Sequence, residues 1–480
     1  MIRRPAALAA LSATLLASCS MVPHYSRPQV TIPAEFKEAP GWRVATPSDA
    51  VARGAWWQLF PDPVLDDLEN RVARNNQNIA AAVAAYDQAR AVVREQRAAL
   101  FPTVDLSTGA TRAGSFGPNE AIITGNGANS GGSGGRSQRY SVSVGATWEP
   151  DLWGRIRAGV KQAGALAAAS KGDLIAATLS AQGELALNYL QLRAIDRQAE
   201  LLKATLAAYQ RNFQIVTNRY NAGVVAKVDV LQAQTQLVSA RADATDLARQ
   251  RAILEHAIAV LIGENPSTYS LAAAPWSSFV PAVPSIVASS LLERRPDVAA
   301  AERRVVAANA AIGIQRAAFF PTINLNGNVG AQSSSLGSLF TAASSLWSFG
   351  LTGALTLLDF GARSARVAQA RAAYMQAVAN YRQTALTAFQ DTEDQLAANR
   401  VLALVGADRT AASTAADRVE QLTLNQYLAG QISYTDVITA QTTALTARVT
   451  ALNATLNRQT AAVALIQALG GSWVEPPAKP

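Results

Sequence analysis

The sequence contains a single cysteine, Cys19, and only two histidines, His24 and His256, among its 480 residues. One cysteine excludes an intrachain disulfide, and these low counts argue against a Cys/His metal site. Charged residues make up only 16% of the chain, and its net charge of +8 is not gathered into long runs of Lys and Arg. We therefore interpret the charge as solvated surface and expect no nucleic-acid partner.

The sequence also lacks an apolar run of the ~18 residues that a membrane-spanning helix needs. Two arginines at 3–4 precede a shorter apolar stretch at 5–18, a pattern typical of a secretory signal. This stretch ends in "LASC" at 16–19, which resembles the bacterial lipobox. The resemblance implies that 1–18 is a signal peptide and that Cys19 carries the lipid. The alternative is an ordinary signal whose cleavage site lies near a cysteine.

Four motifs occur twice in the same order, and the second copy follows the first after 207 to 219 residues. The pairs are "RAALFPT" at 97–103 and "RAAFFPT" at 316–322, "DLWGR" at 151–155 and "DFGAR" at 359–363, "YNAG" at 220–223 and "YLAG" at 427–430, and "DVLQAQTQLVSAR" at 229–241 and "DVITAQTTALTAR" at 436–448. This regularity indicates an internal duplication. We assign 66–263 to the first repeat and 293–470 to the second, with 19–65, 264–292 and 471–480 outside both.

Alternation of apolar and small polar residues predicts two strands in each repeat, at about 103–111 and 140–150, and at about 322–332 and 347–358. Strands of ~10 residues with aromatic residues at their ends favour a sheet that crosses a bilayer, although a half-buried soluble sheet also alternates. The expected interfacial aromatic girdle consists of Phe101, Tyr140, Trp148, Trp153, Phe320, Trp347 and Phe360.

Four strands are too few to close a membrane barrel, which needs about eight or more. Two copies would supply eight strands, whose side chains nearly fill the interior, whereas three would supply twelve and leave a pore. A channel therefore implies an oligomer, and the trimer is the smallest open solution.

Long segments without proline predict two long helices in each repeat, at about 156–219 and 229–262, and at about 361–427 and 436–469. Leucines repeat every seven residues in the first return helix, at 247, 254 and 261, as in a coiled-coil seam. A soluble coiled-coil bundle would explain these helices, but it would not explain the strands or the lipobox.

Each long helix should end at a Tyr-x-x-Gly motif, because glycine after the last turn allows the left-handed conformation that stops a helix. The return helix then begins near an aspartate, which complements the helix dipole. The residues of these two turns are Tyr220, Gly223 and Asp229 in the first repeat, and Tyr427, Gly430 and Asp436 in the second. We interpret Asp151 and Asp359, at strand-to-helix junctions, as helix caps and expect no catalytic site.

Further stretches, taken together, resemble the outer-membrane factor family of tripartite efflux pumps, the TolC- and OprM-like exit ducts, and in particular its NodT-like lipoprotein branch. These stretches are "VPHYSRPQVTIPAEF" at 22–36, "WWQLFPDPVLDDLENRVARNNQNIAAAVAAYDQAR" at 56–90, "WEPDLWGR" at 148–155, "LLERRPDVAAAERRVVAANAAIG" at 291–313 and "ALGGSW" at 468–473. With the duplicated motifs, the resemblance covers essentially 15–475.

The resemblance implies an α+β membrane protein that forms a homotrimer, with a twelve-stranded outer-membrane β-barrel continuous with a periplasmic α-helical barrel. The segments outside the repeats would form an equatorial region. The implied function is passive export of drugs or other small solutes, without a cofactor other than the lipid on Cys19. The implied partners are a periplasmic adaptor, an inner-membrane transporter of the resistance-nodulation-division type, and outer-membrane lipid. Alternatives are an exit duct for type I protein secretion and a lipid-anchored coiled-coil scaffold.

The resemblance also implies a periplasmic aperture at the helix turns. Asp436 matches the position of an acidic ring in TolC, and Tyr427 and Asp229 match a gating hydrogen-bond pair there. The chain departs from that pattern at Ile432, where TolC has an arginine, and at Thr439, where it has a second acidic ring. We therefore expect a less charged constriction with a weaker latch.

Overall fold

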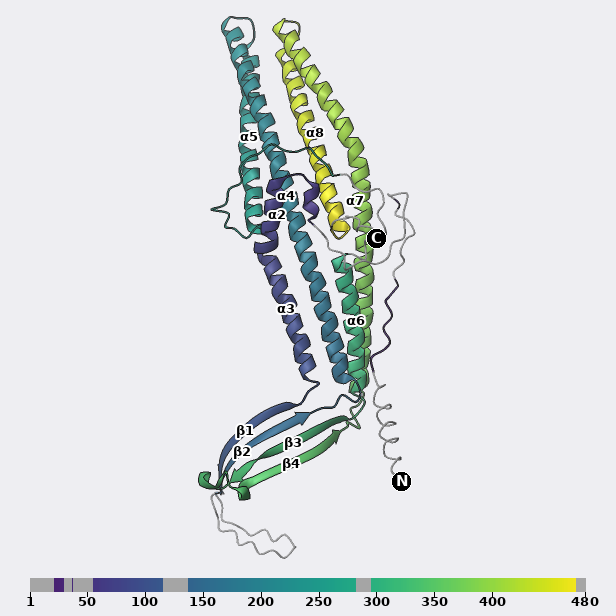
Figure 1. Cartoon of the computed structure of the whole chain (residues 1–480). Coiled ribbons are helices and arrows are strands. Elements are labelled where there is room, and N and C mark those ends of the chain that lie inside the picture. The colour runs from purple at the N-terminus through teal and green to yellow at the C-terminus, as the bar shows by residue number, and fades with distance from the viewer. Residues whose placement is uncertain (1–20, 30–36, 38–54, 115–136, 282–294, 472–480) are drawn as a thin grey trace, which may run out of the picture. The chain divides into compact units, whose positions relative to one another are not determined.

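The computed structural model describes residues 21–29, 37, 55–114, 137–281 and 295–471 (Figure 1). The expected signal peptide and the lipidation site Cys19 lie outside these residues. The chain divides into two compact units. The sheet unit contains 1–27, 88–167 and 303–378, and the hairpin unit contains 28–87, 168–302 and 379–480. Each unit therefore takes residues from both sequence repeats.

Four strands form one antiparallel sheet in the order β1-β2-β3-β4 (Figure 1). The strands are β1 (Thr103–Ala113), β2 (Ser137–Trp148), β3 (Thr322–Ser333) and β4 (Ser345–Ala354). β4 ends four residues before the expected end at 358. The pairing explains this difference, because Ala354 is opposite Thr322, the first residue of β3, and Pro321 before it cannot donate a backbone hydrogen bond.

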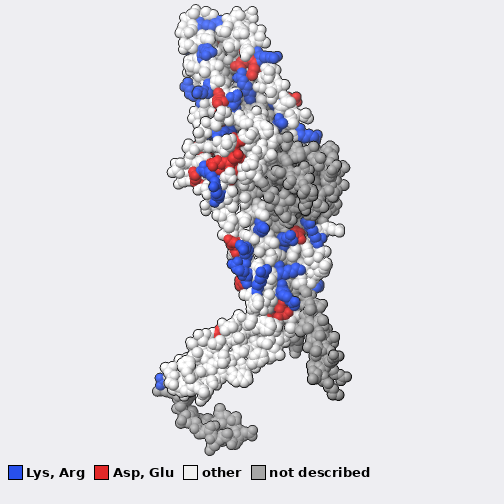
Figure 2. Space-filling view, viewed as in Figure 1, with Lys and Arg blue, Asp and Glu red and all other residues white. Residues whose placement is uncertain are grey.

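The register aligns the alternation of all four strands. Leu106 is opposite Val144, which is opposite Val329, which is opposite Trp347, so one face of the sheet is apolar. The adjacent row, on the opposite face, contains Asp105, Gly145, Asn328 and Ser348. Trp347 is 80% exposed within the protomer. Figure 2 shows that the sheet carries almost no charge on the face in view.

The long helices have matching lengths in the two repeats. α4 (Arg155–Asn221) and α7 (Ala362–Leu428) contain 67 residues each, and the return helices α5 (Lys227–Leu261) and α8 (Tyr434–Ala468) contain 35 each. A 67-residue helix is ~100 Å long. The return helices begin at 227 and 434, two residues before the expected aspartates. Among the described residues, no helix is both long enough and apolar enough to cross a membrane.

Shorter elements complete the fold. The helices are α2 (Pro63–Asn75), α3 (Gln77–Ala98) and α6 (Pro296–Ala317), and the 3-10 helices are η1 (Trp56–Leu59), η3 (Leu336–Ser338) and η4 (Ala342–Ser344). The hairpin unit has a core in which α2 packs its apolar stripe, Leu65, Leu68 and Val72, with Trp56 and with residues of α4, α5 and α8. The two hairpin turns, which join α4 to α5 and α7 to α8, lie outside this core (Figure 1).

Candidate functional site at the hairpin turns

The two turns share one backbone geometry. Gly223 and Gly430 have φ of +73° and +75°, in the left-handed region that glycine tolerates. Each glycine N–H donates to the carbonyl of the tyrosine three residues before it, Tyr220 or Tyr427, at 2.9 Å. The Tyr-x-x-Gly motif therefore ends both long helices in the same way, and it fixes where each return helix begins.

Tyr427 and Tyr434 form the core of the second turn. Their ring centroids are 5.3 Å apart with an interplanar angle of 54°, and both residues are buried. They belong to a small apolar cluster with Val216 and Val230 of the first hairpin and Val437 of the second. The tip is therefore a packed contact between the two hairpins.

Arg219, in the last turn of α4, reaches across to the second hairpin. Its guanidinium carbon is 4.8 Å from the centroid of the Tyr427 ring, and its Nη1 donates to the backbone carbonyl of Tyr427 at 3.3 Å. We did not single out this residue from the sequence. A signal existed, because Arg219 precedes Tyr220 where the second repeat has Gln426 before Tyr427.

The expected hydrogen bond between Tyr427 and Asp229 is not formed. The Tyr427 hydroxyl is buried and has no hydrogen-bond partner in the described structure. Burial raises the pKa of this hydroxyl, the Arg219 charge opposes the shift, and the nearby Asp229 carboxylate adds to it. Asp229 therefore lies close enough to act on Tyr427 electrostatically, but the contact that joins the hairpins comes from Arg219.

Asp436 occupies the first turn of α8 and is exposed. Its carboxylate accepts the backbone N–H of Ser433 at 3.0 Å and the Ser433 hydroxyl at 2.7 Å. One oxygen receives both hydrogen bonds, so the carboxylate keeps acceptor capacity toward solvent. The residue caps its helix while presenting negative charge at the turn.

The other residues of the turns make local contacts. Tyr220 is exposed, and the Lys227 ammonium lies 5.2 Å from the centroid of its ring. Ile432 is half-buried against the apolar cluster, and the Thr439 hydroxyl donates to the Thr435 carbonyl within its own helix. Among the described residues, no group of three His, Cys, Asp or Glu side chains could hold a metal ion.

The residues expected to form the aromatic girdle fall into two sets along the sheet. Five lie where the strands meet the helices, and we call these the helix-side aromatic row: Phe101, Trp148, Trp153, Phe320 and Phe360. Trp148 donates to the Leu100 carbonyl at 3.0 Å, and Trp153 donates to the Pro321 carbonyl at 2.7 Å. Trp153 also stacks on Phe320 at 4.8 Å. Tyr140 and Trp347 lie toward the other end of the strands, near Ser333 and Ser345.

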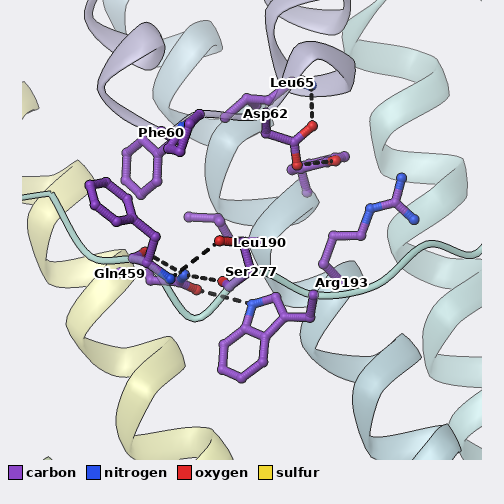
Figure 3. Close-up of a pocket in the computed structure, with 11 residues that line it drawn as sticks. Phe60, Asp62, Leu65, Leu190, Arg193, Ser277 and Gln459 are labelled. Carbon is purple, nitrogen blue, oxygen red and sulfur yellow. Dashed lines mark hydrogen bonds between the residues drawn. The ribbon is translucent and has the colours of Figure 1, made fainter.

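A small pocket in the hairpin unit is lined by polar side chains that hold neighbouring segments together (Figure 3). The Gln459 amide donates to the carbonyls of Ser277 and Phe279 at 2.7 and 2.8 Å and accepts from the Trp276 indole at 3.1 Å. On its other side Tyr189 donates to Asp62, at 2.6 Å. These polar groups hold the inter-repeat segment against α8 and the start of α2 against α4, and their mutual hydrogen bonds leave few groups for a ligand.

The chain is similar to known outer-membrane efflux proteins. The family described as outer membrane efflux protein matches residues 68–264 and 287–471. Two Pseudomonas putida proteins, the antibiotic efflux pump outer membrane protein ArpC and the toluene efflux pump outer membrane protein TtgC, are each 31% identical over 470 residues, covering 97% of this chain and 95% of each relative. The open state of the Neisseria gonorrhoeae MtrE outer membrane channel is 29% identical with a TM-score of 0.82, and the match covers 94% of this chain and 98% of that one.

Proposed function

Because the chain belongs to the outer membrane efflux protein family, we propose that it is the outer-membrane exit duct of a tripartite efflux system and conducts small solutes passively to the exterior. The observation that carries this proposal is the sheet, whose register places apolar side chains on one face and Asn, Ser, Thr and Gly on the other. A lipid-facing surface opposite a wet lumen requires this division. The role needs no catalytic residue and no cofactor.

The working assembly in this proposal is a homotrimer with a twelve-stranded barrel. β1 and β4 are the edge strands, and neither pairs on its outer side with another described strand. Unpaired backbone groups are costly in a bilayer, so the edges must be satisfied by other copies of the chain. Three copies give twelve strands and an open lumen, continued by the helical hairpins as a periplasmic α-barrel.

The proposed partners are a periplasmic adaptor, which would contact the hairpins, and an inner-membrane transporter of the resistance-nodulation-division type. Energy and cargo selection would lie with that transporter. The relatives are named for antibiotics and toluene, so we propose small, mainly apolar compounds as the cargo. Co-purification of the full chain with an adaptor and a transporter from its own membranes tests this assignment.

The lipid anchor on Cys19 is also part of the proposal, and it would mark the chain for the outer membrane. We expect a Cys19→Ser variant to lose label from a radiolabelled palmitate precursor, while a substitution at Ser26 keeps it. Label retained in the Cys19→Ser variant would show that the cysteine is not the lipidated residue.

Conductance tests the channel itself. Purified full-length protein should form discrete channels in planar bilayers, and the trimer should migrate as a heat-modifiable species in detergent. A protein that fractionates with the outer membrane but never forms channels would contradict the proposal and favour a lipid-anchored scaffold.

A further inference from the structure

The two units differ sharply in charge. Counted over the described residues, the sheet unit has 15 Lys and Arg against five Asp and Glu, a net charge of +10, whereas the hairpin unit has 20 against 23, a net charge of −3. Figure 2 shows Lys and Arg gathered over the helices next to the sheet, while the sheet itself is nearly free of charge. The positive charge of the chain is therefore concentrated beside the sheet.

Three of the five acids in the sheet unit are already paired. Glu149 binds Arg155 at 2.7 Å, Asp151 binds Arg157 at 3.1 Å, and Asp359 binds Arg363 at 2.6 Å. Asp151 and Asp359 also accept backbone N–H groups at the starts of α4 and α7. These acids are therefore committed to local structure and leave an excess of cations.

Six of the remaining cations form what we call the basic collar. They are Arg94, Arg97, Lys161, Arg316, Arg366 and Arg371. No side chain of the six makes an ion pair or hydrogen bond with any described residue, and all are exposed or half-exposed. Each lies within ten residues of a helix end that adjoins the sheet, which confines the collar to a band ~15 Å deep along the helices.

Helix dipoles account for only part of the collar. Arg97 and Arg316 lie in the last turns of α3 and α6, where a cation is favourable. Lys161, Arg366 and Arg371 lie within the first three turns of α4 and α7, and neither helix has an acid in its first turn. All three lie beyond the first turn, within which the dipole effect falls off, so the helix dipole does not account for their positions.

The surroundings of the collar indicate what neutralises it. The adjoining sheet has one exposed apolar face, and the helix-side aromatic row lies between this face and the collar within the same unit. Trp and Tyr belts mark the headgroup level of a bilayer, and Lys and Arg just outside it attract anionic lipid. A cation band at this depth is therefore placed opposite lipid phosphates.

We propose that the basic collar binds the phosphate groups of anionic phospholipids at the periplasmic surface of the membrane in which the sheet lies. This inference rests on the proposed function only in that the sheet must lie in a bilayer. It concerns a lipid partner of the protein, not its transport activity.

The test uses the purified full chain in neutral detergent, with phosphatidylglycerol or phosphatidylcholine added. Phosphatidylglycerol should bind and raise the thermal unfolding midpoint, and added salt should weaken the effect. The variant Lys161→Gln/Arg366→Gln/Arg371→Gln should bind phosphatidylglycerol about tenfold or more weakly. The matched control Arg211→Gln/Arg241→Gln/Arg409→Gln makes the same charge change on exposed residues of the hairpin unit and should bind like wild type.

Several results would overturn the inference. Equal responses to the two lipids, or equal loss in the collar and control variants, would do so. If the collar variant altered the ion selectivity of the channel but bound lipid like wild type, the collar would lie in the lumen instead. If the collar variant lost binding to purified peptidoglycan sacculi but kept lipid binding, the partner of the collar would be peptidoglycan. Wild-type channels that ignore phosphatidylglycerol would remove only the lipid inference, whereas absence of channels would remove the proposed function.

Discussion

Arg219 lies over the ring of Tyr427 and donates to the backbone carbonyl of the same residue, although the two positions are 208 residues apart in the chain. One side chain of the first hairpin thus makes two contacts with the last turn of α7 in the second. The contact joins the two hairpins at the tip of the protomer.

Removing Arg219 should loosen the tip. The cation–π contact and the charge-assisted hydrogen bond together contribute about 1–3 kcal/mol, so Arg219→Ala should increase the open population of the channel about tenfold. Single-channel recording measures this change. Arg211→Ala, two turns earlier on α4, is the control.

Tyr427→Phe should leave conductance unchanged because the hydroxyl has no partner in the described structure. An increase in conductance in that variant would support a hydrogen bond between Tyr427 and Asp229.

Asp436 has two separable roles. Asp436→Asn should reduce the preference of the channel for cations, because three symmetry-related carboxylates at the proposed aperture would lose their charge. Ser433→Ala should instead weaken the start of α8 by about 1 kcal/mol and leave ion selectivity unchanged. Reversal potentials in a salt gradient measure selectivity for both variants. Equal selectivity in Asp436→Asn and wild type would leave Asp436 with the capping role alone.

Glu69 should make stability depend on pH. Its carboxyl is fully buried, and neither oxygen has a hydrogen-bond partner among the described residues. Burial, with a smaller contribution from Asp66, raises its pKa to about 9 from 4.5. Between these values the unfolded chain binds fewer protons than the native one, so the free energy of unfolding falls as pH rises.

Replacing this carboxyl should therefore stabilise the protein. Glu69→Met should gain about 3 kcal/mol at pH 7 and almost nothing at pH 4, where the carboxyl is neutral in both states. Thermal unfolding in detergent at the two pH values measures the difference. Glu95→Met, on an exposed position of α3, should show no such dependence. A gain that is the same at both pH values would assign the effect to packing.

Gln459 should hold the inter-repeat segment in place. Gln459→Leu would remove the hydrogen bonds to the carbonyls of Ser277 and Phe279 and from the Trp276 indole. Each is worth about 0.5–1.5 kcal/mol, because these partners are partly exposed and can bind water instead. We expect faster proteolysis within 264–281 and a lower unfolding midpoint. Gln369→Leu, on an exposed position of α7, is the comparison, and equal cleavage rates in the two variants would show that the anchor lies elsewhere.

Local patterns in the sequence predicted much of the fold. Alternation located all four strands because each strand has one apolar face, and glycine spacing located both turns because few other residues adopt positive φ. Alternation failed at Leu355 and Leu357, which continue the pattern beyond the point where β3 can pair. Pattern alone does not record whether a partner strand is present.

The parts of the site that escaped the sequence depend on contacts between distant segments. Arg219 meets Tyr427 only because two hairpins pack at their tips, and no local period reports such a contact. Glu69 was not singled out from the sequence, yet it shares the buried stripe of α2 with Leu65, Leu68 and Val72. In both cases tertiary packing, which composition and spacing do not encode directly, decided the environment of the side chain.

In the proposed assembly, the outer edges of β1 and β4, which pair with no other described strand, make insertion of the sheet depend on the concentration of chains. A lone protomer would bring two unsatisfied backbone ladders into hydrocarbon, so it gains nothing by inserting before it meets its partners. Insertion and association should then be a single step whose rate rises steeply with the local concentration of chains. Under this scheme a cell that synthesises the chain slowly would accumulate periplasmic protomers rather than partly built pores.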